Sequence, residues 1–271
     1  LGQWIIAEAS TAIQQATKAL EVYRFDDYAL SCYRFVWNCF CDWFLEFAKP
    51  VFASNDTAEA AEIREVAAYV FGIILRLLQP VMPFVTDELW TSFGFGKQGS
   101  LISQVWPEPI VLAGAEAAQA ECNHIIRLIS EIRTVRAEMN VPPSQKAPVF
   151  LQDAAQHTME RAERWQEAIG RMARVSHVAL QQGNVPRGSA QAVVGEATLI
   201  IPLEGLIDIT AEEERLKKEL AKADDEIAKT DKKLGNENFV ARAKPEIVQE
   251  MRDRLAAQQG ESIRLKAALA R

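Results

Sequence analysis

The 271-residue sequence holds few of the residues on which an enzyme active site depends. It has three histidines, and none has a partner at metal-ligand or catalytic-triad spacing: His124, His157 and His177. It also lacks a glycine-rich phosphate loop, a His-x-Gly-His pattern and a Lys-Met-Ser-Lys-Ser segment. We therefore predict that the chain contains no catalytic residues and is inactive as an enzyme by itself.

Cysteine is scarce too, and the four present do not suit a disulfide framework in a chain of this size. Three fall in one helix-like stretch (Cys32, Cys39 and Cys41), and Cys122 stands apart. Because Cys39 and Cys41 are two residues apart, they diverge on a helix and would not bind one metal ion. We predict buried, reduced thiols, no metal site and a cytoplasmic location.

Long apolar runs are missing as well, and no signal-peptide pattern follows Leu1. We predict no membrane contact. The composition, 49% hydrophobic and 25% charged, provides enough apolar mass for a core. The length suits two domains, or one domain with an appendage. We interpret the start at Leu1 rather than at methionine as a boundary inside a longer protein.

The net charge of −7 offers no overall attraction for a nucleic acid. Residues 1–206 hold the acidic excess, with 16 basic and 23 acidic side chains, whereas residues 207–271 carry 14 of each. If RNA binds to this chain, local clusters of lysine and arginine must attract it, because the overall field does not.

Apolar periodicity predicts a helical bundle in residues 1–143. Asp26 or Asp27 is expected to cap its second helix, and Pro50 to help end it. In that helix one broad apolar face, which we interpret as core and not as a base-stacking platform, combines Tyr33, Val36, Trp37, Phe40, Phe44 and Phe47. The expected helices are Trp4 to Val22, Tyr28 to Lys49, Asn55 or Asp56 to Leu78, Met82 to Trp90, and Ala115 to Met139.

The pattern changes after Pro142 and Pro143, which end the last of these helices. Residues 144–206 predict a small α+β junction module. Its strands are expected at Pro148 to Leu151, Val175 to Leu180, Ala192 to Val194, and Thr198 to Leu203. The fold class predicted for the whole chain is therefore mainly α, with this module between the bundle and a final helical segment.

That final segment, residues 207–271, has the clearest periodicity in the chain. Two apolar seams with 3-4 spacing flank a break at residues 235–238, so we predict an antiparallel coiled-coil hairpin. The first arm, of about 24 residues, would extend roughly 36 Å. An arm of that length cannot bury much of its surface against the rest of the chain, so it should project.

Four segments resemble valyl-tRNA synthetases. Arg24 to Pro50, RFDDYALSCYRFVWNCFCDWFLEFAKP, closely resembles their anticodon-binding helical domain. Leu77 to Trp90, LLQPVMPFVTDELW, is similar to a signature that the isoleucine and leucine enzymes share in looser form. Glu131 to Lys146 and Asn236 to Leu255 resemble the valine enzyme more particularly. The chain departs from the family at Val81-Met82, where Phe-Met is usual, and at Asp87, where Glu is usual. The family's Asn-Lys-Leu-Trp-Asn helix is not present either.

The resemblance implies a non-catalytic, tRNA-binding C-terminal part of a class I aminoacyl-tRNA synthetase, a valine–tRNA ligase. It implies two partners, tRNA(Val) and the upstream catalytic and editing domains of the same chain. In that family the hairpin arm binds near the outer corner of the tRNA. ATP and magnesium act in the catalytic core, so the resemblance implies no cofactor for the present residues.

The candidate RNA-binding residues are basic or aromatic side chains placed off the predicted apolar faces: Arg34, Phe35, Lys49, Arg127, Arg133, Arg136, Lys229, Lys232, Lys233, Arg242 and Lys244. Residues 229–244 hold five basic and two acidic side chains, which makes the hairpin tip the foremost phosphate-contact candidate. Each group has a structural alternative. The arginines could form a solvated face, Lys49 could join a polar network with Asn38, Asp42 and Glu46, and the arm lysines could form ion pairs within the arm.

Two other functions compete with this interpretation. The hairpin could dock a partner helix through its apolar seam, which would make the chain a protein-binding adaptor. The chain could also be the equivalent part of an isoleucyl- or leucyl-tRNA synthetase, although the predicted hairpin with its Asn-Glu-Asn-Phe tip disfavours that assignment.

Overall fold

The computed structural model describes residues 1–54, 57–235 and 245–269. They form two compact units: residues 1–127 with 167–172, and residues 128–166 with 173–271. The mainly α class, with a helical bundle and a small four-stranded sheet, agrees with the predicted fold class. None of the helices in the described ranges has a stretch long and apolar enough to cross a membrane.

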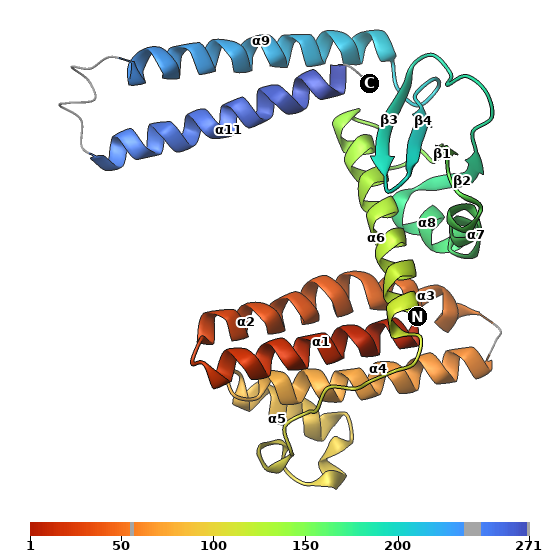
Figure 1. Ribbon diagram of the computed structural model, residues 1–271, viewed down its shortest axis with the longest axis vertical. Helices are drawn as coiled ribbons and strands as arrows, with labels where there is room; N and C mark the ends of the chain where they lie inside the picture. Colours follow the sequence, from red (N-terminus) through yellow and green to blue (C-terminus); the bar gives the residue numbers. More distant parts are fainter. Residues whose placement is uncertain (55–56, 236–244, 270–271) are drawn as a thin grey trace. The chain divides into compact units, whose positions relative to one another are not determined.

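The first unit is a helical bundle in which α1 lies beside α2 and α4 (Figure 1). Its core includes the fully buried side chains of Trp4, Ile13, Phe44 and Ile73. The helices are α1 (Gly2–Glu21), α2 (Phe25–Tyr33), the π-helix η1 (Arg34–Phe44), α3 (Leu45–Ala53), α4 (Thr57–Leu78) and α5 (Pro83–Ser92), followed by the 3₁₀ turns η2 (Phe95–Gln98) and η3 (Leu101–Ser103).

The π-helix η1 changes which aromatic side chains reach the core. Its hydrogen bonds run from residue i to i+5, so one turn takes in more residues than a turn of α-helix. The larger buried side chains along α2, η1 and α3 are consequently spaced by four, three, five, four and three residues: Tyr28, Cys32, Phe35, Phe40, Phe44 and Phe47. The prediction that Trp37 lies in the core is wrong, because it rests on α-helical spacing and this segment is π-helical. Trp37 is 55% exposed, and Phe35, which was expected off the apolar face, is 4% exposed.

Helices α2, η1 and α3 follow one another without a break from Phe25 to Ala53 and are called the rod below. Two expected ends in the rod are also wrong. Helix α2 begins after Arg24 without a side-chain cap, and Asp26 and Asp27 lie in its first turn, where both form ion pairs with the Arg24 guanidinium at 2.9 and 3.2 Å. Helix α3 continues through Pro50 to Ala53. Proline removes one backbone hydrogen bond from a helix, but the helix persists here because the neighbouring Phe47 and Ala48 are buried in the bundle.

Tyr28 joins α2 to the end of α4. Its ring is 1% exposed, and its hydroxyl donates a hydrogen bond to the Leu77 carbonyl. The carbonyls in the last turn of a helix have no partner within the helix, so this hydroxyl satisfies one that is buried. Burial raises the pKa of Tyr28, which keeps the phenol protonated as the donor.

Helix α6 (Ala115–Glu138) leads into the second unit, and its predicted buried side is confirmed. The five expected side chains are all fully buried: Ile125, Leu128, Ile129, Ile132 and Val135. The helix ends four residues before Pro142, through Asn140 with a backbone φ of +51°. Asparagine tolerates this left-handed conformation better than most residues do.

A four-stranded sheet of order β2-β1-β4-β3 forms the centre of the predicted α+β module. Strand β1 pairs parallel with β2 and antiparallel with β4, and β4 pairs antiparallel with β3 around a tight turn at Gly195. Two helices lie between β1 and β2 in the chain. The elements are β1 (Ala147–Gln152), α7 (Gln156–Arg164), α8 (Gln166–Ala173), β2 (Val175–Leu180), β3 (Ser189–Val194) and β4 (Ala197–Pro202).

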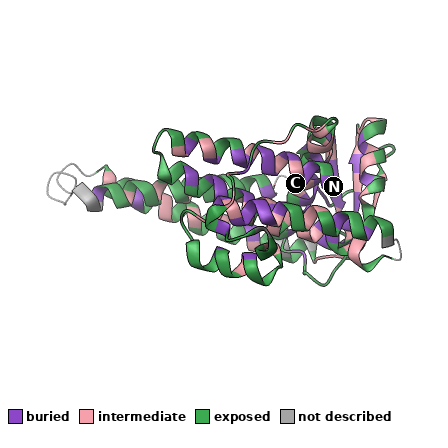
Figure 2. Cartoon of the chain, turned by 90° about the horizontal axis from the view of Figure 1, so that it is seen from below, coloured by how far each residue is buried: buried purple, intermediate pink, exposed green. Residues whose placement is uncertain are grey.

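The predicted helical hairpin consists of α9 (Ile209–Leu234) and α11 (Pro245–Leu269), which lie antiparallel (Figure 1). Asp208 caps α9, since its Oδ1 accepts from the Ala211 amide at 3.0 Å. Most residues of both helices are exposed; exposed residues are green in Figure 2. The few side chains buried between them include apolar Leu216 and Val248 but also polar Thr230 and Ser262.

The π-helical register generates a stability prediction. We expect Phe44→Ala to lower the free energy of unfolding by about 3–5 kcal/mol, because it removes a fully buried aromatic side chain. Trp37→Ala should change it by only about 0.5 kcal/mol, as is usual for exposed positions. Urea denaturation followed by circular dichroism measures both. Equal losses for the two variants would contradict the π-helical register.

Candidate nucleic-acid interface

Three lysines near the end of α9 face solvent: Lys229, Lys232 and Lys233. Lys232 and Lys233 lie in the last helical turn, where the carbonyl dipoles stabilise positive charge. No ion pair engages any of the three within the described ranges, and Asp231 is the one acidic residue between them. The other two candidates of this predicted cluster, Arg242 and Lys244, lie outside the described residues.

Two of the three acidic residues that precede these lysines on α9, Asp224 and Glu226, are engaged by α11, whereas Asp225 is exposed. Glu226 Oε2 accepts from Arg254 at 3.1 Å and from Gln258 at 2.8 Å. Asp224 Oδ1 accepts from the Ser262 hydroxyl at 2.7 Å and lies 3.6 Å from the Lys266 ammonium. Because these carboxylates serve the pairing of the two helices, they do not neutralise the lysines at the end of α9.

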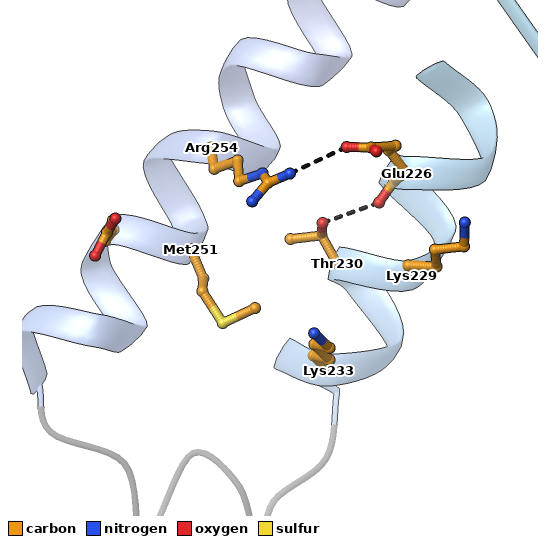
Figure 3. A pocket seen from close by; sticks show the side chains of 7 residues that line it. Glu226, Lys229, Thr230, Lys233, Met251 and Arg254 are labelled. Carbon is orange, nitrogen blue, oxygen red and sulfur yellow. Dashed lines mark hydrogen bonds and ion pairs between the residues drawn. The ribbon is translucent and has the colours of Figure 1, made fainter. Parts of the chain in front are cut away.

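A cleft of about 280 Å³ opens between the two helices at this position (Figure 3). Figure 3 shows Arg254 directed across it toward Glu226. Three cations and two carboxylates line the cleft, together with Thr230 and Met251: Lys229, Lys233, Arg254, Glu226 and Glu250. The positive excess and the polar lining suit an anion such as a phosphate oxygen.

Polar side chains within the seam hold α9 and α11 in one register. The Thr230 hydroxyl donates to the Glu226 carbonyl at 2.9 Å and lies 3.3 Å from the Gln258 side-chain oxygen. Thr230 and Ser262 are buried at the interface, where an apolar residue would pack more favourably. Polar residues in a coiled-coil seam lower stability but specify register and pairing. The 3-4 spacing places Thr230, Gln258 and Ser262 in the seam, and the structure shows that the seam is partly polar at these positions.

The three arginines of α6 do not share one environment. Arg127 and Arg133 are exposed, and Arg133 takes part in an interaction within the chain. Arg136 is 6% exposed, and its guanidinium donates to three backbone carbonyls, those of Arg174 at 3.3 Å, Pro142 at 3.1 Å and Gln145 at 2.8 Å. Arg136 thus links the end of α6 to the start of the sheet, and its guanidinium is not available to contact RNA.

The bundle candidates also separate by exposure. Arg34 is exposed, whereas Phe35 is buried in the core. Lys49 is exposed and forms an ion pair with Glu46, which holds the pKa of that carboxyl below its usual value. Glu46 also pairs with Arg171 at 3.0 Å, so the polar network expected around Lys49 is centred on this carboxylate. Among the described residues no ion pair engages Arg34, so its charge is available to a ligand.

The two buried cysteine thiols are protonated at neutral pH. All four cysteines are free; the prediction of buried thiols holds for Cys32 and Cys122, whereas Cys39 and Cys41 are partly exposed. Burial raises the pKa of the Cys32 thiol to about 11 and that of Cys122 to about 12. A thiol with such a pKa is protonated at pH 7, and the thiolate is the nucleophile and metal ligand. Within the described ranges no three His, Cys, Asp or Glu side chains gather in a metal-binding cluster.

Two family models match this chain, one over the helical bundle and one over the helical hairpin. The family model described as "Anticodon-binding domain of tRNA ligase" matches residues 2–151, which is more than half of the chain. The chain belongs to this family. A second model, described as "Valyl tRNA synthetase tRNA binding arm", matches residues 208–271, the segment that contains α9 and α11. The resemblance found in the sequence is thereby confirmed.

Relatives that match over the whole chain are named valine–tRNA ligases. The chain is 58% identical over 272 residues to that of Granulibacter bethesdensis and 56% identical over 271 residues to that of Gluconobacter oxydans. It is 44% identical over 275 residues to that of Caulobacter vibrioides. Each comparison covers all of this chain but 30% of the relative, so the chain spans about a third of their length, at the C-terminal end.

The sequence alone did not identify two exposed aromatic side chains, Tyr33 and Trp37, or the arginine of the cleft, Arg254, as candidates for binding. Tyr33 and Trp37 were assigned to the core, because a π-helix has no recognised signature in a single sequence. Arg254 was not singled out as a cation near the lysines. Its placement in the cleft depends on the register between α9 and α11, and helical periodicity alone does not specify that register.

The buried arginine of α6 gives a second prediction. We expect Arg136→Gln to lower the free energy of unfolding by about 2–4 kcal/mol, since hydrogen bonds to a charged group contribute about 1.5–3 kcal/mol each and buried carbonyls lose their donors. Arg133→Gln, on the exposed side of the same helix, is the matched control and should change it by about 0.5 kcal/mol. Equal denaturation midpoints for the two variants would contradict the structural role of Arg136.

Proposed function

We propose that this chain binds tRNA, and specifically a valine tRNA, and holds it for aminoacylation by the rest of a valine–tRNA ligase. The observation that carries the proposal is the coincidence of two independent features in one segment. The segment that matches the tRNA-binding-arm model ends α9 with three exposed lysines free of ion pairs within the described ranges. Lysine and arginine side chains supply most of the affinity of proteins for nucleic acids, through contacts with phosphates.

The chain would act by positioning, not by making or breaking bonds. Phosphate contacts along the arm and the bundle would fix the orientation of the tRNA, so that its 3′ end reaches a distant catalytic centre. Holding two reactants in the correct geometry lowers the barrier by removing the entropic cost of bringing them together. The relatives are named for the ligation of valine to tRNA, and we assign that reaction, with the ATP and magnesium that the resemblance implies, to the longer protein.

Two observations disfavour the rival functions. A protein-binding adaptor needs a free apolar seam, whereas the seam of α9 is occupied by α11 and includes polar Thr230 and Ser262. The isoleucyl or leucyl alternative is disfavoured by a match to the arm of the valyl enzyme in particular. Affinity for valine tRNA over a non-cognate tRNA, measured by filter binding, would test the specificity.

The salt dependence of tRNA binding tests the proposed phosphate contacts. We expect replacement of Lys229, Lys232 and Lys233 by glutamine to weaken binding and to reduce the slope of log K against log salt by about 0.7–0.9 for each phosphate that is no longer bound. Helicity should be unchanged, because glutamine is a good helix former and these side chains lie outside the seam. Filter binding across a salt series, with circular dichroism alongside, gives both quantities.

A matched control uses three lysines at the other end of the same helix. Lys217, Lys218 and Lys222 are equally exposed, but residues 211–222 carry four acidic side chains against four basic ones, and Lys217 already pairs with Glu213 at 3.0 Å. Their replacement by glutamine removes the same charge and should leave the slope nearly unchanged. An equal fall in slope for both triple variants would show that the arm attracts RNA by its total charge, not through the cluster at the end of α9.

A further inference from the structure

Two aromatic rings of the bundle are stacked on each other outside the core. Tyr33 is 56% exposed and Trp37 is 55% exposed. Their ring centroids are 6.5 Å apart and their planes differ by 10°, which is the geometry of an offset stack. Because each ring is more than half exposed, the pair presents a flat aromatic surface to solvent. Aromatic side chains usually bury most of their area, so this exposure needs a reason.

The backbone produces this pair directly. Tyr33 ends α2 and Trp37 lies in the first turn of the π-helix η1, four residues later. The same change of register that turns Phe35 and Phe40 into the core leaves Tyr33 and Trp37 together on the outer face. Stretches of π-helix are rare in proteins and are found frequently at functional sites.

Polar groups suited to recognition flank the rings. Arg34 and Asn38 are exposed and occupy the positions that follow Tyr33 and Trp37, again four residues apart. Among the described residues, neither side chain forms a hydrogen bond or an ion pair. Asp42, one further turn along the rod, is exposed and carries the opposite charge. The face therefore combines two stacked rings, a guanidinium, an amide and, at its edge, a carboxylate.

We propose that Tyr33, Arg34, Trp37 and Asn38 form a binding site for an unpaired RNA base. A base has a flat face that stacks on aromatic rings, and hydrogen-bonding edges that an amide and a guanidinium recognise. A paired base inside a duplex does not expose its face, so the site selects single-stranded nucleotides. Arg34 contacts the adjoining phosphate or a base edge. This inference rests on the proposed tRNA binding and assigns four side chains of the bundle to one base of the RNA.

The nature of the groups favours RNA over a protein partner. An apolar helix docking on this face would bury Arg34 and Asn38 against aliphatic side chains and leave both without hydrogen-bond partners, which is costly. A phosphate alone would use Arg34 but not the rings. A nucleotide uses all four side chains.

The first test uses the protein with its natural sequence. The probe is the anticodon stem–loop of a valine tRNA with 2-aminopurine at single loop positions. We expect binding to quench its fluorescence at one or more positions, since quenching follows stacking on an aromatic ring. A fully paired duplex of the same length, labelled in its centre, should bind more weakly and show no quenching. Absence of quenching at every loop position, at protein concentrations that saturate binding, would overturn the proposal.

Variants then locate the site. Tyr33→Leu combined with Trp37→Leu should weaken stem–loop binding by about 5- to 150-fold, the equivalent of about 1–3 kcal/mol for one stacked base. The slope of log K against log salt should stay the same, because stacking releases no counterions. Trp37→Phe, which keeps a ring, should retain most of the affinity. Phe84→Leu is the matched control, since Phe84 is an aromatic residue of α5 that is 89% exposed and has no stacked partner among the described residues.

The outcomes separate this proposal from the proposed function. If the chain does not bind tRNA at all, the proposed function fails. If tRNA binds but the Tyr33 and Trp37 double variant binds the stem–loop as tightly as the natural sequence does, only the base site fails. Equal weakening by Phe84→Leu would also overturn it, since any exposed aromatic ring would then have the same effect. Binding of an apolar helical peptide that competes with the stem–loop, without 2-aminopurine quenching, would assign the face to a protein partner instead.

Discussion

The first unit depends on one apolar face that runs along α2, η1 and α3. That face stays in contact with the bundle over its whole length because the π-helix corrects its direction midway, at the five-residue step from Phe35 to Phe40. With α-helical spacing throughout, the face would rotate away and Phe44 and Phe47 would not follow Phe35 into the core. A second link, from Tyr28, joins this rod to α4 through a buried hydrogen bond. The same constraint leaves aromatic rings of the rod outside the core.

In the hairpin of α9 and α11, the decisive constraint is which side chains the carboxylates of α9 pair with. The segment has as many acidic as basic residues, so its total charge offers an RNA no attraction. Pairing of α9 with α11 engages Glu226 with Arg254 and Gln258, and Asp224 with Ser262. Asp225 and Asp231 are then the two carboxylates of α9 that remain near the three lysines, so the end of α9 keeps a small positive excess. A neutral segment thus acquires a local positive surface, which is the property that contact with phosphates requires.

These two constraints act at different ranges. Base recognition depends on the direction of a few side chains, so it is sensitive to a change of register by one residue. Phosphate contact depends on the charge within about a Debye length, roughly 8–10 Å, and tolerates variation in the exact positions of the lysines. A chain that uses both could orient a tRNA through one base-specific contact in the bundle while the arm supplies affinity.

Periodicity and helix-breaking residues determined most of the fold. All four strands were predicted within three residues of their observed ends, and the hairpin and the buried face of α6 followed from 3-4 spacing. These features are local, since each depends on residues within one or two turns of each other. Two ends were predicted wrongly, for different reasons. Helix α3 continues past Pro50 because Phe47 and Ala48 are buried in the bundle. Helix α2 begins among exposed residues, where Asp26 and Asp27 pair with Arg24 instead of capping the helix.

Only the tertiary structure decided which side chains are available for function. The sequence by itself identified the family, the mainly α class and the basic cluster of the arm. It could not distinguish exposed Trp37 from buried Phe35, because the choice between i+4 and i+5 hydrogen bonds depends on what the rod packs against. Nor could it separate Arg136 from Arg133, three positions apart on one helix, since the contacts of Arg136 depend on how the chain turns after α6 and on where Arg174 returns to it. A side chain's chemistry is written in the sequence, whereas its partners, and so its freedom to bind a ligand, are set by contacts between residues far apart in the chain.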